Sequence, residues 1–156
     1  MKNILIVLGL ILAIILQFSV APFFLFYGVV PNLVLVLALF ISILEKFDKS
    51  WKWIIFAGLL LDLFSSHLFG LSSLCLVTTV YIISLLNVKI FSVLKFWIFS
   101  ILIIVGTMIY GALLYFSIRI FQGDSILNFK YLFIESLYNL VILAFLYGFK
   151  KILYKE

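Results

Sequence analysis

Long unbroken apolar runs, separated by short polar segments, dominate the chain. Residues 4–16 and 33–44 contain almost no polar side chain. Transmembrane β-strands would instead alternate polar and apolar residues with a period of two. The pattern therefore predicts membrane-spanning helices, each of which needs about 20 residues to cross a hydrocarbon core about 30 Å thick.

Six such helices are expected in one transmembrane domain covering residues 1–156. Residues 53–86 contain Asp62 as their only charged residue. A single helix of that length would be about 51 Å long, so the chain must turn at the polar segment 65–70. Pro31 suits the first turn of the second helix, because it has no backbone N–H to leave unpaired there. The expected helices are residues 3–20, 31–44, 53–66, 71–86, 96–118 and 131–149.

The segments between these helices are expected to be connectors at the membrane surface. Residues 21–30 are rich in aromatic side chains, which favour the interface. Residues 45–52 form the only dense charge cluster and are expected to be an aqueous loop, as are residues 87–95 and 119–130. The first apolar run could alternatively be a cleaved signal peptide. Cleavage would leave Pro22 as the first residue and more membrane sequence after it, so we expect a retained helix.

Composition and charge narrow the class of protein. The chain is 67% hydrophobic and 11% charged, whereas soluble domains carry about 25% charged residues. This composition excludes soluble enzymes and nucleic-acid-binding proteins.

The net charge of +5 is explained by the tendency of Lys and Arg to remain on the cytoplasmic side. If residues 53–86 crossed the membrane once, the basic residues would divide six against five. With six spans they divide nine against two, so both termini are expected in the cytoplasm. The nine are Lys2, Lys46, Lys49, Lys52, Lys89, Lys95, Lys150, Lys151 and Lys155, and the two are Arg119 and Lys130.

Asp62 is the clearest polar residue at membrane depth, where an ionisable group costs roughly 2.5–3.5 kcal/mol. Helical spacing puts it on one face with Gly58, Ser65 and Ser66, and this small, polar face is expected to point into the bundle. The carboxylate could bond a neighbouring helix or cap the turn, carry an ion or proton, or contact a partner protein. Its candidate partners are Asn32, Ser72, Ser73, Thr78, Thr79 and Asn139.

The last helix carries two further polar residues. Glu135 lies near the expected outer boundary, where a solvated carboxylate is the simplest interpretation, and Asn139 is deep enough for a hydrogen bond inside the bundle. Catalytic patterns are absent: His67 is the only histidine and falls in a turn, and Cys75 is the only cysteine. We therefore expect neither an enzyme nor a metal or cofactor site.

Pro31 and Asn32 open a Leu-rich helix, Gly58 precedes Asp62 by one turn, and Gly70 is followed by leucine. This arrangement resembles the MreD family of rod shape-determining proteins. Residues 31–71 carry this specific pattern, and the remainder of the chain agrees in length and hydropathy. The family pattern falls on Pro31, Asn32, Gly58, Asp62 and Gly70, and we add Ser65, Ser66 and Asn139 as structural or interaction candidates.

The resemblance implies a non-enzymatic scaffold in the inner membrane of a bacterium, acting in the cell-elongation complex that builds peptidoglycan. It also implies association with the lipid bilayer and the bitopic protein MreC and, indirectly, with MreB, RodA and a class B penicillin-binding protein. The family's fold is similar to the substrate-binding subunits of energy-coupling-factor transporters. A vitamin-binding subunit is therefore the alternative, and another small channel or assembly factor is a third possibility.

Overall fold

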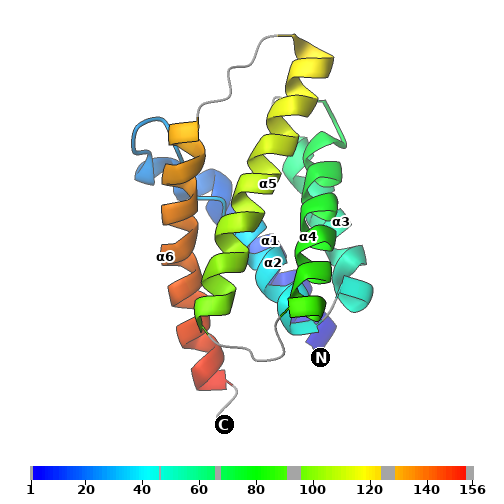
Figure 1. Ribbon diagram of the computed structural model, residues 1–156, viewed down its shortest axis with the longest axis vertical. Coiled ribbons are helices and arrows are strands. Elements are labelled where there is room, and N and C mark those ends of the chain that lie inside the picture. Colours follow the sequence, from blue (N-terminus) through cyan, green and yellow to red (C-terminus); the bar gives the residue numbers. More distant parts are fainter. Residues whose placement is uncertain (1, 46, 66–67, 91–95, 124–128, 154–156) are drawn as a thin grey trace.

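The computed structural model describes residues 2–45, 47–65, 68–90, 96–123 and 129–153. Within these residues the chain forms six α-helices and one short 3-10 helix (Figure 1). The prediction of an all-helical fold with six helices is thereby confirmed. The elements are α1 (Lys2–Ser19), η1 (Ala21–Phe24), α2 (Leu33–Glu45), α3 (Phe47–Phe64), α4 (Leu71–Ile90), α5 (Phe96–Gln122) and α6 (Phe129–Leu153).

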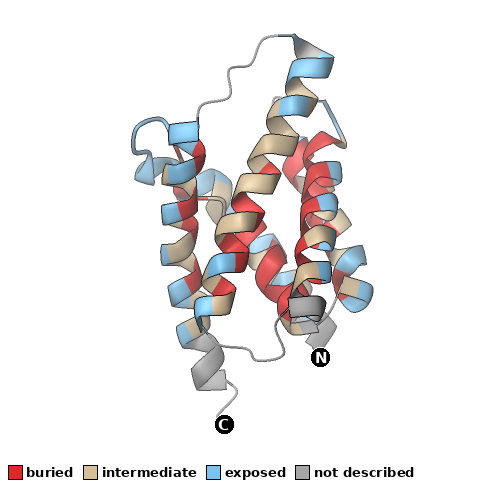
Figure 2. Ribbon diagram, in the orientation of Figure 1, coloured by how far each residue is buried: buried red, intermediate tan, exposed pale blue. Residues whose placement is uncertain are grey.

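Helix α2 is the axis of the bundle. Its sequence, LVLVLALFISILE, is apolar on every side, and a helix without a polar face is stable only when it is surrounded. Five of its side chains are completely buried (Figure 2). It contacts α1, α3, α4, α5 and α6. The buried residues are Val34, Leu35, Val36, Ala38 and Leu39.

The other five helices form an incomplete ring around α2. Helix α1 packs on α3, α3 on α4, α4 on α5, and α5 on α6. Among the described residues, α1 and α6 do not contact each other. The ring is therefore open along one side, between α1 and α6.

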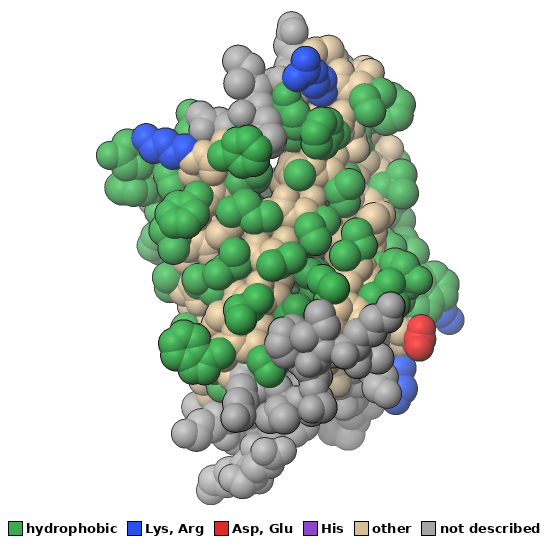
Figure 3. Space-filling model, in the orientation of Figure 1, with side chains coloured by type: hydrophobic (Ala, Val, Ile, Leu, Met, Phe, Trp, Pro, Cys, Tyr) green, Lys and Arg blue, Asp and Glu red, His purple; other side chains and the backbone are tan. Residues whose placement is uncertain are grey.

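The outside of the bundle is apolar along its length. Figure 3 shows large hydrophobic side chains over this lateral face, with the charged side chains near the two ends. Two helical stretches, Phe96–Phe121 and Phe129–Gly148, are long and apolar enough to cross a membrane, and the apolar stretches Ile6–Ser19, Leu33–Leu44 and Leu71–Leu86 are shorter.

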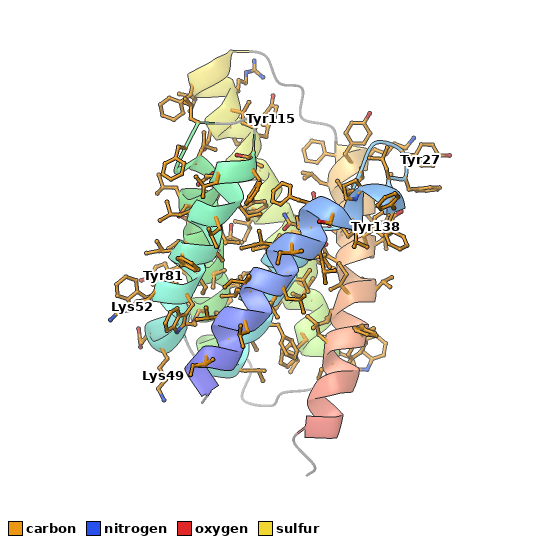
Figure 4. All side chains as sticks on the ribbon, turned by 180° about the vertical axis from the view of Figure 1, so that it is seen from behind. Tyr27, Lys49, Lys52, Tyr81, Tyr115 and Tyr138 are labelled. Carbon is orange, nitrogen blue, oxygen red and sulfur yellow. The ribbon has the colours of Figure 1, made fainter. Side chains whose placement is uncertain are left out.

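The two ends of the bundle differ. Helix α1 begins and α6 finishes at one end, which we call the terminal end, and the opposite end is the distal end (Figure 1). Lys49 and Lys52 lie at the terminal end, whereas Tyr27 and Tyr115 lie at the distal end (Figure 4). The starts of α2, α4 and α6 all lie at the distal end.

The segment between α1 and α2 makes a tight turn at the distal end. Phe26 and Val29 exchange backbone hydrogen bonds of 3.1 and 3.0 Å, and the two residues between them, Tyr27 and Gly28, have φ angles of 51° and 79°. Two successive positive φ angles are typical of a type I′ turn, in which glycine is favoured. The connector is therefore ordered by its own backbone.

Contacts with α6 hold this connector in place. The Tyr138 hydroxyl donates a hydrogen bond of 3.0 Å to the Phe24 carbonyl oxygen. The Lys130 ammonium lies 4.8 Å from the centre of the Tyr27 ring, a distance at which a cation and an aromatic ring attract each other.

Several helix boundaries differ from the sequence prediction. Residues 47–52, expected to be an aqueous loop, form the first turns of α3. Their polarity is one-sided: Ser50 is buried and Phe47 half-buried, while Asp48, Lys49 and Lys52 are exposed. The charges therefore mark the outer face of a helix instead of a break. Helix α4 likewise continues to Ile90 and α5 to Gln122, into segments predicted to be loops.

Helices α3 and α4 are packed closely at Gly58. A Cβ atom added to Gly58 would lie 2.5 Å from the Ser73 Cα atom and 2.9 Å from its Cβ. The nearest atom belongs to the backbone of α4, so a side chain at residue 58 requires the two helices to separate.

We predict that Gly58→Ala destabilises the protein by about 1–3 kcal/mol, the usual cost of overpacking. Gly148→Ala is the matched control, because Gly148 also lies in a helix but has no atom within 4 Å of its added Cβ. Thermal unfolding of the purified protein in detergent measures both effects. Equal stability of the two variants would contradict the close contact at Gly58.

Candidate functional site

The Asp62 carboxylate of α3 accepts backbone hydrogen bonds from three residues at the start of α4. Oδ1 accepts from the Ser72 N–H at 2.9 Å. Oδ2 accepts from the N–H groups of Gly70 at 3.0 Å and Ser73 at 3.1 Å. The first N–H groups of a helix have no partner within that helix, and Gly70, at the N-cap position, has no side chain to bind them. Asp62 therefore caps α4 from the neighbouring helix.

The remaining amides at the start of α4 are also bonded. The Leu71 N–H donates to the Leu68 carbonyl at 3.1 Å, and the Leu74 N–H donates to the Gly70 carbonyl at 2.9 Å. Gly70 has a φ angle of 93°, which is favourable only for glycine. Glycine is thus required at residue 70 by the backbone, and Asp62 supplies the side chain that this glycine lacks.

The start of α4 also provides the electrostatic partner for Asp62. The residue is buried, with 4% of its surface exposed. A helix N-terminus carries roughly half a positive charge, and the three amides add directed hydrogen bonds. This geometry suits a fixed structural role, because a carboxylate that carries an ion or proton must release its present partners.

The other residues predicted to share this face have different positions. Gly58 packs against Ser73, as described above, and the Ser65 hydroxyl donates to the Asp62 backbone carbonyl at 3.3 Å. Ser66 and His67 lie outside the described residues.

A second polar cluster lies at the start of α2. Asn32 is the N-cap residue, and its Oδ1 accepts a hydrogen bond of 3.0 Å from the Leu35 N–H. Pro31 therefore precedes the helix, and its predicted place in the first helical turn is wrong. The physical reason is that the Asn32 side chain caps the helix, and asparagine is among the preferred N-cap residues. The Pro31 carbonyl bonds a side chain of α1.

That side chain is Gln17. Its Nε2 donates to the Pro31 carbonyl at 2.9 Å, and its Oε1 accepts from the Leu33 N–H at 2.7 Å. The side-chain amide of Gln17 thus bonds both a carbonyl group and an N–H group of the backbone that leads into α2. The sequence analysis did not identify Gln17, although it is the first polar residue after the long apolar run of the first helix.

Asn139 extends this cluster to α5 and α6. Its Oδ1 accepts from the Asn32 N–H at 2.9 Å, and its Nδ2 donates to the Thr107 hydroxyl oxygen at 3.0 Å. The Thr107 hydroxyl donates in turn to the Ile103 carbonyl at 2.9 Å. Asn139 and Thr107 are both fully buried. Four helices, α1, α2, α5 and α6, are therefore joined through polar groups at one point. The sequence analysis did not identify Thr107 either.

Of the six candidate partners of Asp62, the structure shows two bonded to its carboxylate. Ser72 and Ser73 bond the carboxylate through their backbone amides. Asn32 and Asn139 bond each other in the second cluster. The Thr79 hydroxyl bonds the Cys75 carbonyl in its own helix, and Thr78 is exposed on α4.

Glu135 is located differently from the sequence expectation. We expected a solvated carboxylate at the membrane boundary. It is half-buried instead and lines a cavity between the helices, as Asn32 does. Within the described residues, no three His, Cys, Asp or Glu side chains gather as a metal site would require.

We predict that Asp62→Leu destabilises the protein strongly, because each buried N–H group left without a partner costs about 1–3 kcal/mol. Asp62→Asn retains one acceptor oxygen and is expected to cost less. Asp48→Asn, at an exposed carboxylate of the same helix, is the control and is expected to have little effect. Thermal unfolding, together with hydrogen exchange of the residue 70–73 amides, measures the difference.

A carrier function of Asp62 makes the opposite prediction. Proton or ion flux into liposomes that disappears in the Asp62→Asn variant would contradict the structural role. We expect no flux with either protein.

One comparison with known proteins identifies a family. The family model described as rod shape-determining protein MreD matches residues 1–156, the whole chain. No curated protein and no solved structure gives a significant match. The chain belongs to the MreD family of rod shape-determining proteins.

Proposed function

We propose that this protein is a non-enzymatic scaffold in the bacterial inner membrane, linking cytoplasmic filaments to peptidoglycan synthesis through an MreC-like bitopic partner. Membership of the MreD family supports a role in rod-shape determination. The observation that carries the proposal is the use of Asp62, Asn32 and Asn139 in internal hydrogen bonds. Deep polar residues that stabilise the fold suit a scaffold better than a catalyst or a carrier.

The proposed topology has six spans and both termini in the cytoplasm. Lys49 and Lys52 lie at the terminal end (Figure 4), and the helix ends that contain Lys2, Lys89, Lys150 and Lys151 lie there too (Figure 1). Arg119 and Lys130 belong to the distal ends of α5 and α6. This distribution supports a cytoplasmic terminal end, because Lys and Arg are enriched on the cytoplasmic side of a membrane.

The open side of the ring is the proposed partner site. A groove of about 330 Å³ lies between α1 and α6, with α2 at its base. Its lining is apolar and includes Leu16, Val20, Leu33 and Val141. Figure 4 shows Tyr138 on α6 beside the connector at the distal end of this groove. A bitopic partner contributes one transmembrane helix, and the ring lacks a contact between one pair of helices, so we assign the groove to that helix.

Site-specific crosslinking tests this partner site. A photoreactive amino acid at Val141 is expected to crosslink to the MreC-like protein in cell membranes. Leu74 of α4 is the matched control: the two side chains are 69% and 72% exposed, but Leu74 lies outside the groove. Crosslinking of equal strength at both positions, or at Leu74 alone, would exclude the groove as the partner site.

Depletion of the protein tests the scaffold role itself. Rods are expected to become spheres, and the purified protein is expected to carry the MreC-like partner with it. Unchanged cell shape together with no such partner would overturn the proposal.

The alternative of a vitamin-transporter subunit has less support. Such subunits generally offer small residues on the first helix for docking of the transport module. Here Ala13 is buried and Gly9 packs against Leu37, while the exposed positions of α1 include Leu8 and Leu12. The outer face of α1 is therefore formed by large side chains.

A further inference from the structure

A cavity of about 650 Å³ lies at the distal end, among α1, the connector, α3, α4, α5 and α6. Small-molecule sites typically have volumes of roughly 300–1,000 Å³. The wall includes the polar side chains of Asn32, Ser72, Tyr110 and Glu135. None of its lining residues belongs to the groove between α1 and α6, so the cavity is separate from the proposed partner site.

Carboxyl groups determine the charge of this cavity. Glu135 lies in the wall, as does Asn32. A carboxylate offers about four acceptor positions, so Glu135 has capacity for a ligand. Asp62 lies behind the wall, because it bonds the Ser72 amide and Ser72 lines the cavity.

The Asp62 carboxylate is already bonded by the amides at the start of α4. Glu135 is therefore the carboxyl group that faces the cavity. No Lys or Arg is present among the described lining residues. The cavity therefore favours a ligand with a single positive charge.

Aromatic and aliphatic side chains determine the chemical type of cation. Phe18 of α1, Tyr110 of α5 and Tyr131 of α6 contribute rings to the wall, together with Leu61 and Leu114. Aromatic rings attract organic cations as well as bind apolar groups. A divalent metal ion instead requires several oxygen ligands, and Glu135 is the only carboxylate among the lining residues.

We propose that this cavity binds a small organic cation, an ammonium or amidinium compound with an apolar body. The Glu135 carboxylate holds its charge, and the rings of Phe18, Tyr110 and Tyr131 enclose its body. This inference goes beyond the scaffold role and does not depend on it.

Binding of benzamidinium to the purified full-length protein in phosphatidylcholine nanodiscs tests the proposal. Benzamide is the matched neutral probe, because it has nearly the same shape without the charge. Isothermal titration is expected to show saturable binding of benzamidinium and at least tenfold weaker binding of benzamide. Similar affinity for the two probes, or no saturable binding of benzamidinium, would overturn the proposal without any variant.

Two variants and one control locate the site. Glu135→Gln keeps the size of the side chain and is expected to weaken benzamidinium binding at least tenfold. Leu114→Trp, which fills the cavity and leaves the carboxylate unchanged, is expected to abolish it. Asp48→Asn removes an exposed carboxylate at the opposite end of the bundle and is expected to retain full affinity. Unchanged affinity in folded Glu135→Gln and Leu114→Trp proteins would exclude this cavity as the binding site.

Discussion

The backbone amides at the starts of α2 and α4 need hydrogen-bond partners, and much of the fold follows from how they are bonded. Both helices begin inside the bundle, where a buried N–H without a partner costs about 1–3 kcal/mol and the hydrocarbon of a membrane offers no substitute. Asp62 bonds the amides of α4. Asn32, Gln17 and Asn139 bond those at the entry to α2. Because three of these four side chains come from other helices, capping the helices also joins α1, α3 and α6 to α2 and α4.

These bonded polar groups lie inside the bundle, away from the surfaces that are available to other molecules. Asp62, Asn32 and Asn139 are bonded within the chain, and the lateral surface is largely apolar. The ring around α2 is open only between α1 and α6 within the described residues, and the apolar groove there is the proposed site for a transmembrane helix of the partner. The distal cavity differs because it combines aromatic rings with the carboxyl group of Glu135. A protein partner and a small ligand would thus bind at different places.

The sequence predicted those features that depend on one helix at a time. Unbroken apolar runs indicated six helices, and helical spacing placed Asp62 on a small face with Gly58 that points inward. The start of α3 was missed because charge density was interpreted as a loop, although Ser50 and Asp48 lie on opposite faces of a regular helix. Glu135 was expected to be solvated because it lies near the start of its helix. That position alone does not reveal how neighbouring helices surround its side chain.

By itself, the sequence determined the membrane class, the number of helices and the presence of a carboxylate that must be shielded from lipid. Hydrophobicity and periodicity are local properties, and they are sufficient for those conclusions. Only the tertiary structure decided that α2 is the axis, that the ring opens between α1 and α6, and which amides Asp62 bonds. These features depend on contacts between distant residues, such as the hydrogen bond between Asn32 and Asn139, which are 107 positions apart. The periodicity of one helix records how much of its surface is apolar, but not which helix covers it.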